Sequence, residues 1–212
     1  MAEQKSIALT FDDGPNTSTT VEMLDVLEAF GVPATFFLVG ENITAETIPV
    51  VRRAYACGCE IANHSVSHAA LSELTPEEIL AEVQPVTEQI TAITGEPPRF
   101  FRPPYIAVSP TVFETVPLPM ICGMGAEDYN DAVSAQQRLE RWLSAAQDGG
   151  ILLLHDSEGN TQTVAAVQKL IPALQAQGYR LVTLSRLFAE KGVQPAAQNG
   201  VLYSCTADGD AV

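Results

Sequence analysis

The 212-residue chain lacks the features of a nucleic-acid-binding or membrane-spanning protein. It has 11 lysines and arginines against 26 aspartates and glutamates, a formal charge of −15. Such a surface repels phosphate backbones and anionic lipids, so we expect no nucleic-acid partner. No run of about 18 apolar residues is present, which predicts no membrane span in this chain. Residues 1–6 also lack the apolar core of a signal peptide, so a cytoplasmic location stays open.

Cysteine and histidine are both scarce. The four cysteines do not form the two Cys-x-x-Cys pairs of a zinc ribbon, so we expect them to be structural or free. The chain has no internal repeat of fixed period, and its 46% hydrophobic and 17% charged residues are typical of one globular domain. With only three histidines in the chain, their positions become informative.

Short apolar segments alternate with amphipathic ones, an order that predicts an α/β fold with a parallel sheet and crossover helices. The predicted strands are Ser6–Phe11, Ala34–Val39, Glu60–Asn63, Arg99–Arg102, Met120–Met124, Ile151–Leu154 and Arg180–Leu184. The predicted helices are Thr19–Phe30, Thr47–Cys57, Pro76–Thr94, Ala135–Asp148 and Thr163–Gln177. A glycine follows each helix as a stop signal, and Thr75 with Glu78 predicts a capping box. We expect one domain over residues 1–189 and a C-terminal tail over 190–212.

Two groups of residues suggest a metal site. Asp12 and Asp13 end the first predicted strand, where the chain turns and both carboxylates can reach one pocket. His64 and His68 are spaced so that one turn of helix would present both imidazoles together. With a carboxylate from Asp13 they would form a three-ligand site for a metal such as zinc, open to water. The second carboxylate would then take a proton from that water, whereas an isolated pair would more often be a solvated turn.

Two further segments follow predicted strands. Arg102-Pro103-Pro104-Tyr105 contains two prolines that stiffen the loop and hold an arginine and a backbone amide in fixed places. His155 follows the apolar strand Ile151–Leu154, a position that suits a general acid but is also that of a polar strand end.

These segments occur in the order Asp12-Asp13-Gly14, His64-x-x-x-His68, Arg102-x-x-Tyr105 and Leu153-Leu154-His155. In this order the chain resembles the polysaccharide deacetylases of carbohydrate esterase family 4, which share a NodB-homology domain. The resemblance extends from about residue 6 to residue 187. It implies a distorted (β/α) barrel of about seven parallel strands, similar to a TIM barrel, with the site at the C-terminal strand ends.

The resemblance also implies a role for each site residue. Asp13, His64 and His68 would bind the divalent metal, most commonly Zn²⁺, with Co²⁺ or another transition metal as alternatives. Asp12 would be the catalytic base, oriented by Arg102, and His155 the catalytic acid. The Tyr105 amide would help to hold the oxyanion, and Leu153 would line the pocket for the acetyl methyl group.

The chain departs from the family pattern at two places. Ile106 stands where the family usually has glycine, and its side chain would narrow the groove beside Tyr105. The motif Asp-x-x-Asp-Trp is matched only by the segment from Gly125 to Tyr129. Asp128 would still tune the acid histidine, and Tyr129 would replace the tryptophan that lines the pocket.

We therefore expect a metal-dependent enzyme that removes N-acetyl groups from glycans, with peptidoglycan ahead of chitin. Two alternatives stay open: an O-acetyl xylan esterase, and a catalytically silent glycan-binding protein with the same fold. The resemblance implies an extracellular or cell-wall location, and we expect a monomer whose partner is its glycan substrate.

Overall fold

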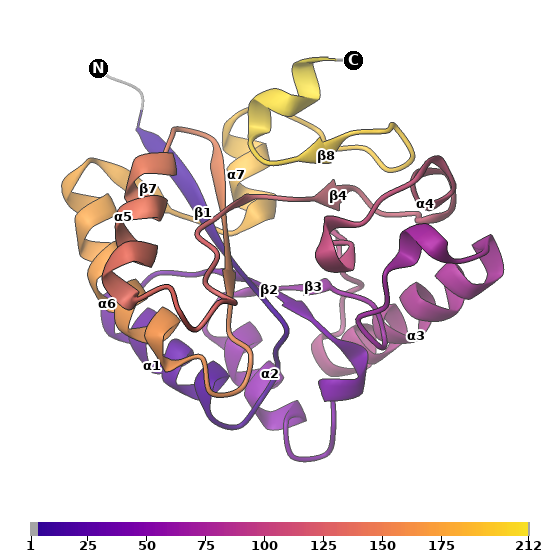
Figure 1. Ribbon diagram of the computed structural model, residues 1–212, viewed down its shortest axis with the longest axis horizontal. Helices are drawn as coiled ribbons and strands as arrows, with labels where there is room; N and C mark the ends of the chain where they lie inside the picture. Colours follow the sequence, from indigo (N-terminus) through magenta and orange to yellow (C-terminus); the bar gives the residue numbers. More distant parts are fainter. Residues whose placement is uncertain (1–3, 212) are drawn as a thin grey trace.

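The computed structural model describes residues 4–211, and strand β1 (Lys5–Asp12) lies at the centre of its main sheet. On one side β1 pairs with β6 (Gly150–His155). On the other side its C-terminal residues pair with β2 (Thr35–Leu38) and its first residues pair with β7 (Tyr179–Leu181). All these pairings are parallel, so the expected α/β fold is confirmed. Figure 1 shows the long β1 arrow crossing the molecule.

The sheet has the strand order β3-β2-β1-β6-β5, where β3 is Glu60–Asn63 and β5 is Met124–Gly125. A separate parallel pair is formed by β4 (Met120–Ile121) and β8 (Leu202–Tyr203). Isolated bridges connect this pair with the main sheet, and one of them joins Gly150 of β6 to Cys205, close to β8. Phe101 also forms single-residue parallel bridges, with Asn63 on one side and with Met120 on the other.

Three strand predictions were wrong in part, and two of them lie between β3 and β6 in the chain. Arg99–Arg102 contributes only the bridges of Phe101, because prolines at 97, 98, 103 and 104 flank it and have no N–H to donate to a ladder. Met120–Met124 is split into β4 and β5, and between them Gly123 has a φ of 120°, outside the extended region.

The helices form an outer layer, with α1, α5 and α6 side by side on one flank and α3 on the other (Figure 1). Their bounds are α1 Thr19–Phe30, α2 Ile48–Ala56, α3 Pro76–Thr94, α4 Pro110–Thr115, α5 Ala135–Ala145, α6 Thr161–Ala176 and α7 Leu184–Glu190. Among residues 4–211, none of the helices combines the length and the hydropathy that a membrane span requires.

Local signals explain several helix ends. The predicted capping box is present, because the Thr75 side chain accepts from the Glu78 amide and the Glu78 carboxylate accepts from the Thr75 amide. Gly95 ends α3 in the left-handed conformation, as predicted. The expected strand Arg180–Leu184 stops at Leu181 because Thr183 caps α7, a helix that was not predicted.

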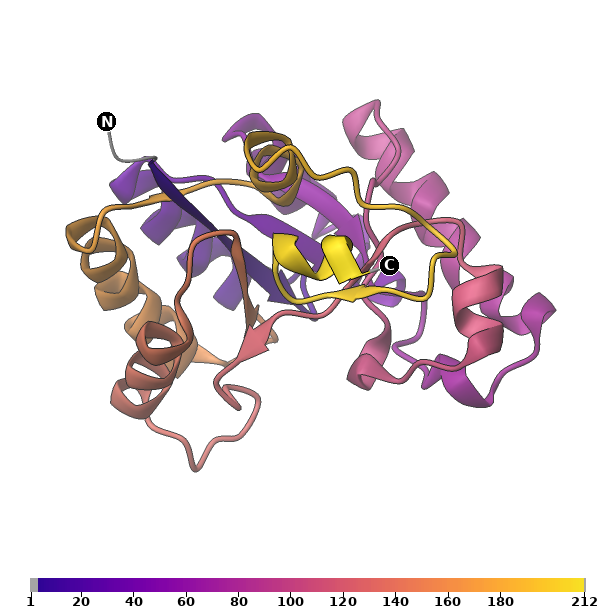
Figure 2. The same cartoon turned by 90° about the horizontal axis from the view of Figure 1, so that it is seen from above.

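The two faces of β1 have different environments. Ile7, Leu9 and Phe11 pack in the cluster that faces α1 and α6, whereas Ala8 packs against the cluster that contains α7 residues. Because side chains alternate along a strand, Thr10 and Asp12 share the inner face with Ala8. Helix α7 and β8 fill one end of this inner face, as Figure 2 shows from above. The buried polar residues Thr10 and Asp12 lie at its other end, where the parallel strands finish.

Candidate active site at the ends of the parallel strands

Asp12 is the last residue of β1, and Asp13 begins the loop that follows. Asp13 has a φ of 74°, a left-handed conformation that few residues other than glycine adopt. Its carbonyl oxygen accepts a hydrogen bond of 2.8 Å from the side-chain amide of Asn42. This sharp turn lets the carboxylates of Asp12 and Asp13 both approach His64. In a regular strand, neighbouring side chains would point to opposite faces of the sheet.

The histidine pair does not lie on a helix, which corrects the prediction from its spacing. His64 follows β3 directly, and both Ser65 (φ 68°) and His68 (φ 59°) have left-handed backbones. Asn63 Oδ1 accepts from the Ser65 amide, and Ser65 Oγ accepts from the His68 amide. These side chains stabilise a tight loop in place of a helical turn. The two imidazole rings still lie 4.8 Å apart between centroids.

The atoms of this loop and of Asp13 form a group that fits a cation. Asp13 Oδ1 lies 3.6 Å from His64 Nε2 and 3.4 Å from His68 Nε2. It is buried and has no hydrogen-bond partner among residues 4–211. His64 Nδ1 donates to the carbonyl oxygen of Arg102 at 2.7 Å, so Nε2 is the ring nitrogen that faces Asp13 and can offer a lone pair to a cation. Lone pairs facing a carboxylate repel one another unless a cation lies between them, and this donor set suits a transition metal.

The charge state of His68 agrees with this arrangement. Burial, reinforced by the neighbouring His64, lowers the pKa of His68. The ring is therefore neutral near pH 7, and the neutral imidazole is the form that binds metals.

Asp12 is held by a buried arginine. The Arg102 side chain is fully buried; it donates to Asp12 Oδ1 through Nη1 and to Thr10 Oγ1 through Nη2 at 2.7 Å. The guanidinium also lies 4.1 Å from the centre of the Phe37 ring. One carboxylate oxygen of Asp12 is therefore occupied, while Oδ2 faces His64 Nε2 at 3.8 Å.

His155 is the last residue of β6 and lies opposite Asp12 in the strand register. Its Nδ1 is 2.8 Å from Asp128 Oδ1, and its backbone N–H donates to Asp128 Oδ2 at 2.8 Å. Burial lowers the pKa of His155, but the Asp128 hydrogen bond and the charges of Asp128, Asp12 and Asp13 raise it to about 9. The ring is therefore protonated at neutral pH and can donate a proton from Nε2.

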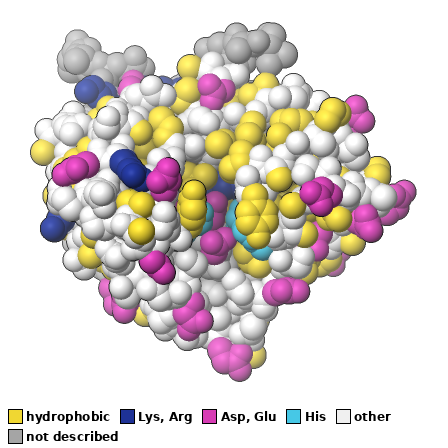
Figure 3. Space-filling model, viewed as in Figure 1, with side chains coloured by type: hydrophobic (Ala, Val, Ile, Leu, Met, Phe, Trp, Pro, Cys, Tyr) yellow, Lys and Arg dark blue, Asp and Glu magenta, His cyan; other side chains and the backbone are white. Residues whose placement is uncertain are grey.

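Two exposed aromatic side chains border these groups. Tyr105 is 72% exposed and its ring lies 4.6 Å from that of His68, while Tyr129 is 69% exposed and lies 5.8 Å from His155. Leu153 is half-buried on β6, where it pairs with Gly125. Figure 3 shows the histidines near the centre of this face, with acidic side chains beside them and hydrophobic side chains on both sides. The structure thus brings the sequence-predicted site residues together.

Sequence reasoning missed four polar residues that support the site. Thr10 Oγ1 accepts from Arg102 and donates to the Leu152 carbonyl oxygen. Thr163 Oγ1 donates to Asp128 Oδ2 at 2.9 Å, and both Asn160 and Arg138 join the same hydrogen-bond network. Thr10 could have been found, because it is a polar residue two positions before Asp12 in an apolar strand. The others lie in helical or loop segments with no local signal.

Asp156 is a second buried acid beside the site. Its Oδ2 accepts from Thr20 Oγ1 at 2.5 Å, and its Oδ1 has no partner among the described residues. Burial, together with the charges of Asp13 and Asp12, raises the pKa of Asp156 to about 7. A Cβ atom at Gly14 would lie 2.6 Å from Asp156 Oδ2, so this approach requires glycine.

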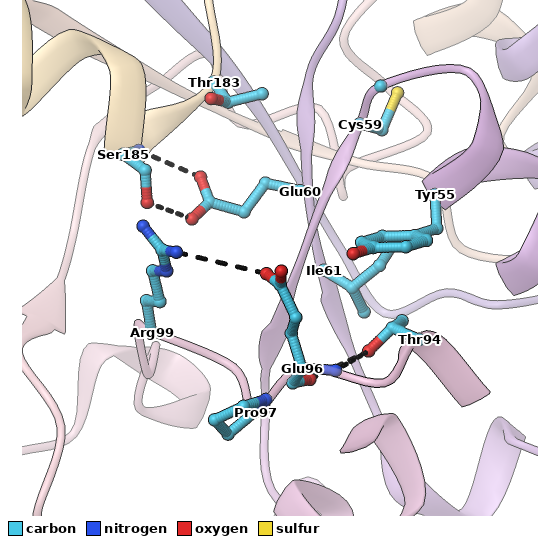
Figure 4. A pocket seen from close by; sticks show the side chains of 11 residues that line it. Tyr55, Cys59, Glu60, Ile61, Thr94, Glu96, Pro97, Arg99, Thr183 and Ser185 are labelled. Atoms are coloured by element: carbon cyan, nitrogen blue, oxygen red, sulfur yellow. Dashed lines mark hydrogen bonds and ion pairs between the residues drawn. The ribbon is translucent and has the colours of Figure 1, made fainter. Parts of the chain in front are cut away.

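A hollow at the opposite end of β3 is separate from this site. In Figure 4, Glu60, the first residue of β3, faces Ser185 near the start of α7. The Glu60 carboxylate accepts from the backbone N–H of Ser185 at 2.9 Å and from its hydroxyl. Because these donors satisfy the carboxylate, its evident task is to hold α7 against the sheet. Cys59 also lines this hollow, and all four cysteines are free, in agreement with the sequence analysis.

Comparison with solved structures shows close similarity over almost the whole chain. The Xyl-CE4 domain of a multidomain xylanase from the hindgut metagenome of Trinervitermes trinervoides has a TM-score of 0.95 at 43% identity and covers 97% of this chain and 100% of that one. A family 4 acetyl xylan esterase from Clostridium thermocellum, in complex with a cobalt ion, has a TM-score of 0.92 at 37% identity. That match covers 95% of this chain and 98% of the esterase chain.

Comparison of sequences agrees with the structural match. A bifunctional xylanase/deacetylase of Pseudobutyrivibrio xylanivorans is 45% identical over 192 residues, covering 91% of this chain and 32% of that protein. A peptidoglycan-N-acetylglucosamine deacetylase of Listeria monocytogenes is 35% identical over 190 residues, 88% of this chain and 40% of that protein. The chain thus spans well under half the length of these relatives. A family model described as polysaccharide deacetylase matches residues 1–117. With the matching fold, these similarities show that the chain belongs to the polysaccharide deacetylase family.

Proposed function

We propose that this chain is a metal-dependent hydrolase that removes acetyl groups from a carbohydrate. The observation that carries the proposal is the buried, unpartnered Asp13 Oδ1, which faces the Nε2 atoms of His64 and His68 beside the free oxygen of Asp12. Held by these three ligands, a divalent metal, which we propose to be Zn²⁺, would supply Lewis acidity for attack of water on the acetyl carbonyl.

Asp12 is the proposed general base. Arg102 holds Oδ1, so that Oδ2 is the oxygen that can take a proton from the attacking water. The buried guanidinium also places a positive charge directly beside the Asp12 carboxylate. The hydrogen bond from Arg102 thus orients Oδ2 of Asp12 toward His64, one of the proposed metal ligands.

His155 is the proposed general acid. Asp128 binds Nδ1 and the backbone N–H, which leaves Nε2 as the nitrogen that can reach a substrate. Protonation of the departing group is needed most for an amine and less for the alcohol of an ester. A protonated His155 therefore allows the site to release either kind of leaving group.

The relatives support two classes of substrate. The xylanase/deacetylase at 45% identity and the acetyl xylan esterase at 37% favour O-acetyl groups on xylan, which we propose as the substrate. The peptidoglycan deacetylase at 35% supports N-acetyl groups of peptidoglycan as the second candidate, the one that the sequence analysis placed first. Either substrate implies action outside the cell or at the wall. In both cases we propose that Tyr105, Tyr129 and Leu153 contact the acetylated sugar, with the Tyr105 amide holding the carbonyl oxygen.

Acetate release from three substrates tests the proposal. The zinc-loaded chain is incubated with acetylated xylan, N-acetylglucosamine oligomers and peptidoglycan fragments, and acetate is measured enzymatically. Faster release from acetylated xylan supports the first substrate class, and faster release from either N-acetylated glycan supports the second. Absence of release from all three would contradict the proposed function, including the deacetylase chemistry itself.

A further inference from the structure

Arg138 is a fully buried arginine on α5 that no proposed catalytic step uses. Its Nε donates to the Val133 carbonyl oxygen at 2.8 Å, and Nη2 donates to the Asn130 carbonyl oxygen at 3.1 Å. Nη1 donates to Asn160 Oδ1 at 2.5 Å and to Thr163 Oγ1 at 2.9 Å. All four acceptors are uncharged. Burying a guanidinium without a hydrogen-bonded carboxylate is costly even with the charges of Asp128 and Asp131 nearby, so its place in the core needs an explanation.

The first consequence concerns the direction of the Thr163 hydrogen bonds. Arginine has only donors, so Thr163 Oγ1 must accept from Arg138. The hydroxyl has a single proton, and the remaining partner within reach is Asp128 Oδ2 at 2.9 Å. With Arg138 donating to the hydroxyl oxygen, the single Thr163 proton is left for Asp128 Oδ2.

The second consequence concerns the orientation of the Asn160 amide. Because Arg138 occupies Oδ1, the Nδ2 group must point the other way. There it donates to the carbonyl oxygens of Asp128 and of His155, each at 3.1 Å. One guanidinium group therefore determines the polarity of two side chains, and these contact both members of the Asp128–His155 pair.

We propose that Arg138 is a positioning residue for the general acid, acting through Thr163 and Asn160 to hold the Asp128 carboxylate in the orientation that binds His155. The inference rests on the proposed function, because only a reaction with a leaving group makes the acid necessary. The competing explanation is that Arg138 merely ties the loop of residues 126–133 to α5.

Arg141 provides a matched control for that competing explanation. It lies one turn after Arg138 on α5 and also binds the same loop, through the Ala126 carbonyl oxygen at 2.9 Å and the Glu127 carboxylate at 2.8 Å. It makes no hydrogen bond to Thr163 or Asn160 within residues 4–211. Arg141 is exposed whereas Arg138 is buried, so the two variants are compared by the ratio of glycan to aryl-ester turnover, which loss of loop attachment alone should change equally in both.

The test compares leaving groups. The acid matters most for the amine of an N-acetylated glycan, less for the alcohol of an O-acetylated one, and least for 4-nitrophenyl acetate, which releases a stable anion. We expect Thr163→Val to lower kcat on the glycan about 10-fold, and Arg138→Met at least as much, with less than about 3-fold loss on the aryl ester. Thr163→Ser, which keeps the hydroxyl, and Arg141→Met should retain wild-type ratios. Zinc affinity should be unchanged in all four variants.

A double variant separates a shared path from two independent effects. If Arg138 acts through Thr163, R138M combined with T163V should cost less than the product of the two single losses. Equal losses on glycan and aryl ester, or equal effects of R141M and R138M, would overturn the inference. Failure of the wild type to release acetate from any glycan would instead contradict the proposed function.

Discussion

The Asp128→Asn substitution tests whether the carboxylate makes His155 a proton donor. In the wild type, Asp128 Oδ2 accepts from two donors, the His155 backbone N–H and the Thr163 hydroxyl. In the variant these donors select the amide oxygen, so that the NH₂ group faces Nδ1 of His155. An NH₂ group only donates, and the ring must present a lone pair there. The neutral tautomer with its proton on Nε2 is then favoured.

The size of the effect follows from the pKa of His155. Burial lowers this pKa, but Asp128 and the nearby Asp12 and Asp13 raise it from 6.5 to about 9, which corresponds to about 3 kcal/mol in favour of the imidazolium. Without the Asp128 charge, the pKa should fall below its ordinary value because burial then acts with less opposition. A general acid contributes about 100-fold or more to turnover, so kcat on an acetylated glycan should fall by about that factor near neutral pH.

The same shift makes a prediction for stability. The folded-state pKa of His155 lies above its unfolded value, so its stabilisation is full below about pH 6.5 and is lost as the pH rises through about 9. The variant lacks this contribution. The difference in free energy of unfolding between wild type and D128N should therefore shrink between about pH 6 and about pH 10, by up to about 3 kcal/mol.

Three measurements check this reasoning. NMR titration of the His155 ring in metal-free protein gives its pKa, urea unfolding at several pH values gives the stability difference, and the pH dependence of kcat gives the effect on turnover. The alkaline limb of the kcat profile should move to lower pH in D128N. A variant whose His155 still titrates near 9, or whose turnover is unchanged, would refute the assignment of Asp128.

The remaining predictions concern the base, the metal and a glycine contact. Asp12→Asn should abolish acetate release while zinc affinity, measured by calorimetry, stays near that of the wild type; unchanged turnover would exclude Asp12 as base. His68→Ala should weaken zinc binding by more than about 100-fold, and a chelator should stop wild-type activity until zinc or cobalt is added. Activity that persists after chelation would contradict metal dependence. Gly14→Ala places a Cβ atom 2.6 Å from Asp156 Oδ2 and should lower the free energy of unfolding by about 1–3 kcal/mol. Gly125→Ala meets its nearest atom at 4.0 Å and should have little effect on urea unfolding.

Local sequence signals predicted much of the secondary structure, for a physical reason. Helices α1 and α3 begin and end at the predicted residues, because caps and stop signals act between neighbours in the chain. The strand prediction at Arg99–Arg102 was wrong for a local reason as well, because the flanking prolines have no N–H to donate to a ladder. Helix α5 stops at Ala145 instead of Asp148, and Asp148 instead accepts a hydrogen bond from the distant backbone N–H of Ser6 in β1.

The sequence alone determined which chemistry was available at the site. Two adjacent carboxylates, two histidines four residues apart and a histidine after an apolar strand are a donor set for a metal and for proton transfer, wherever they lie in space. The spacing of His64 and His68 did not determine the local backbone conformation, because the two residues meet through a left-handed loop and not a helix.

The resemblance implied a role for each group, and only the tertiary structure shows the contacts that distinguish them. Arg102 occupies one oxygen of Asp12, Asp13 Oδ1 is left without a partner, and Asp128 reaches His155 from a distant loop. The direction of each of these hydrogen bonds depends on donors that come from other strands and helices. Such contacts form only when the chain has folded, so no local pattern of residues encodes them, and the network from Arg138 to His155 could be found only in three dimensions.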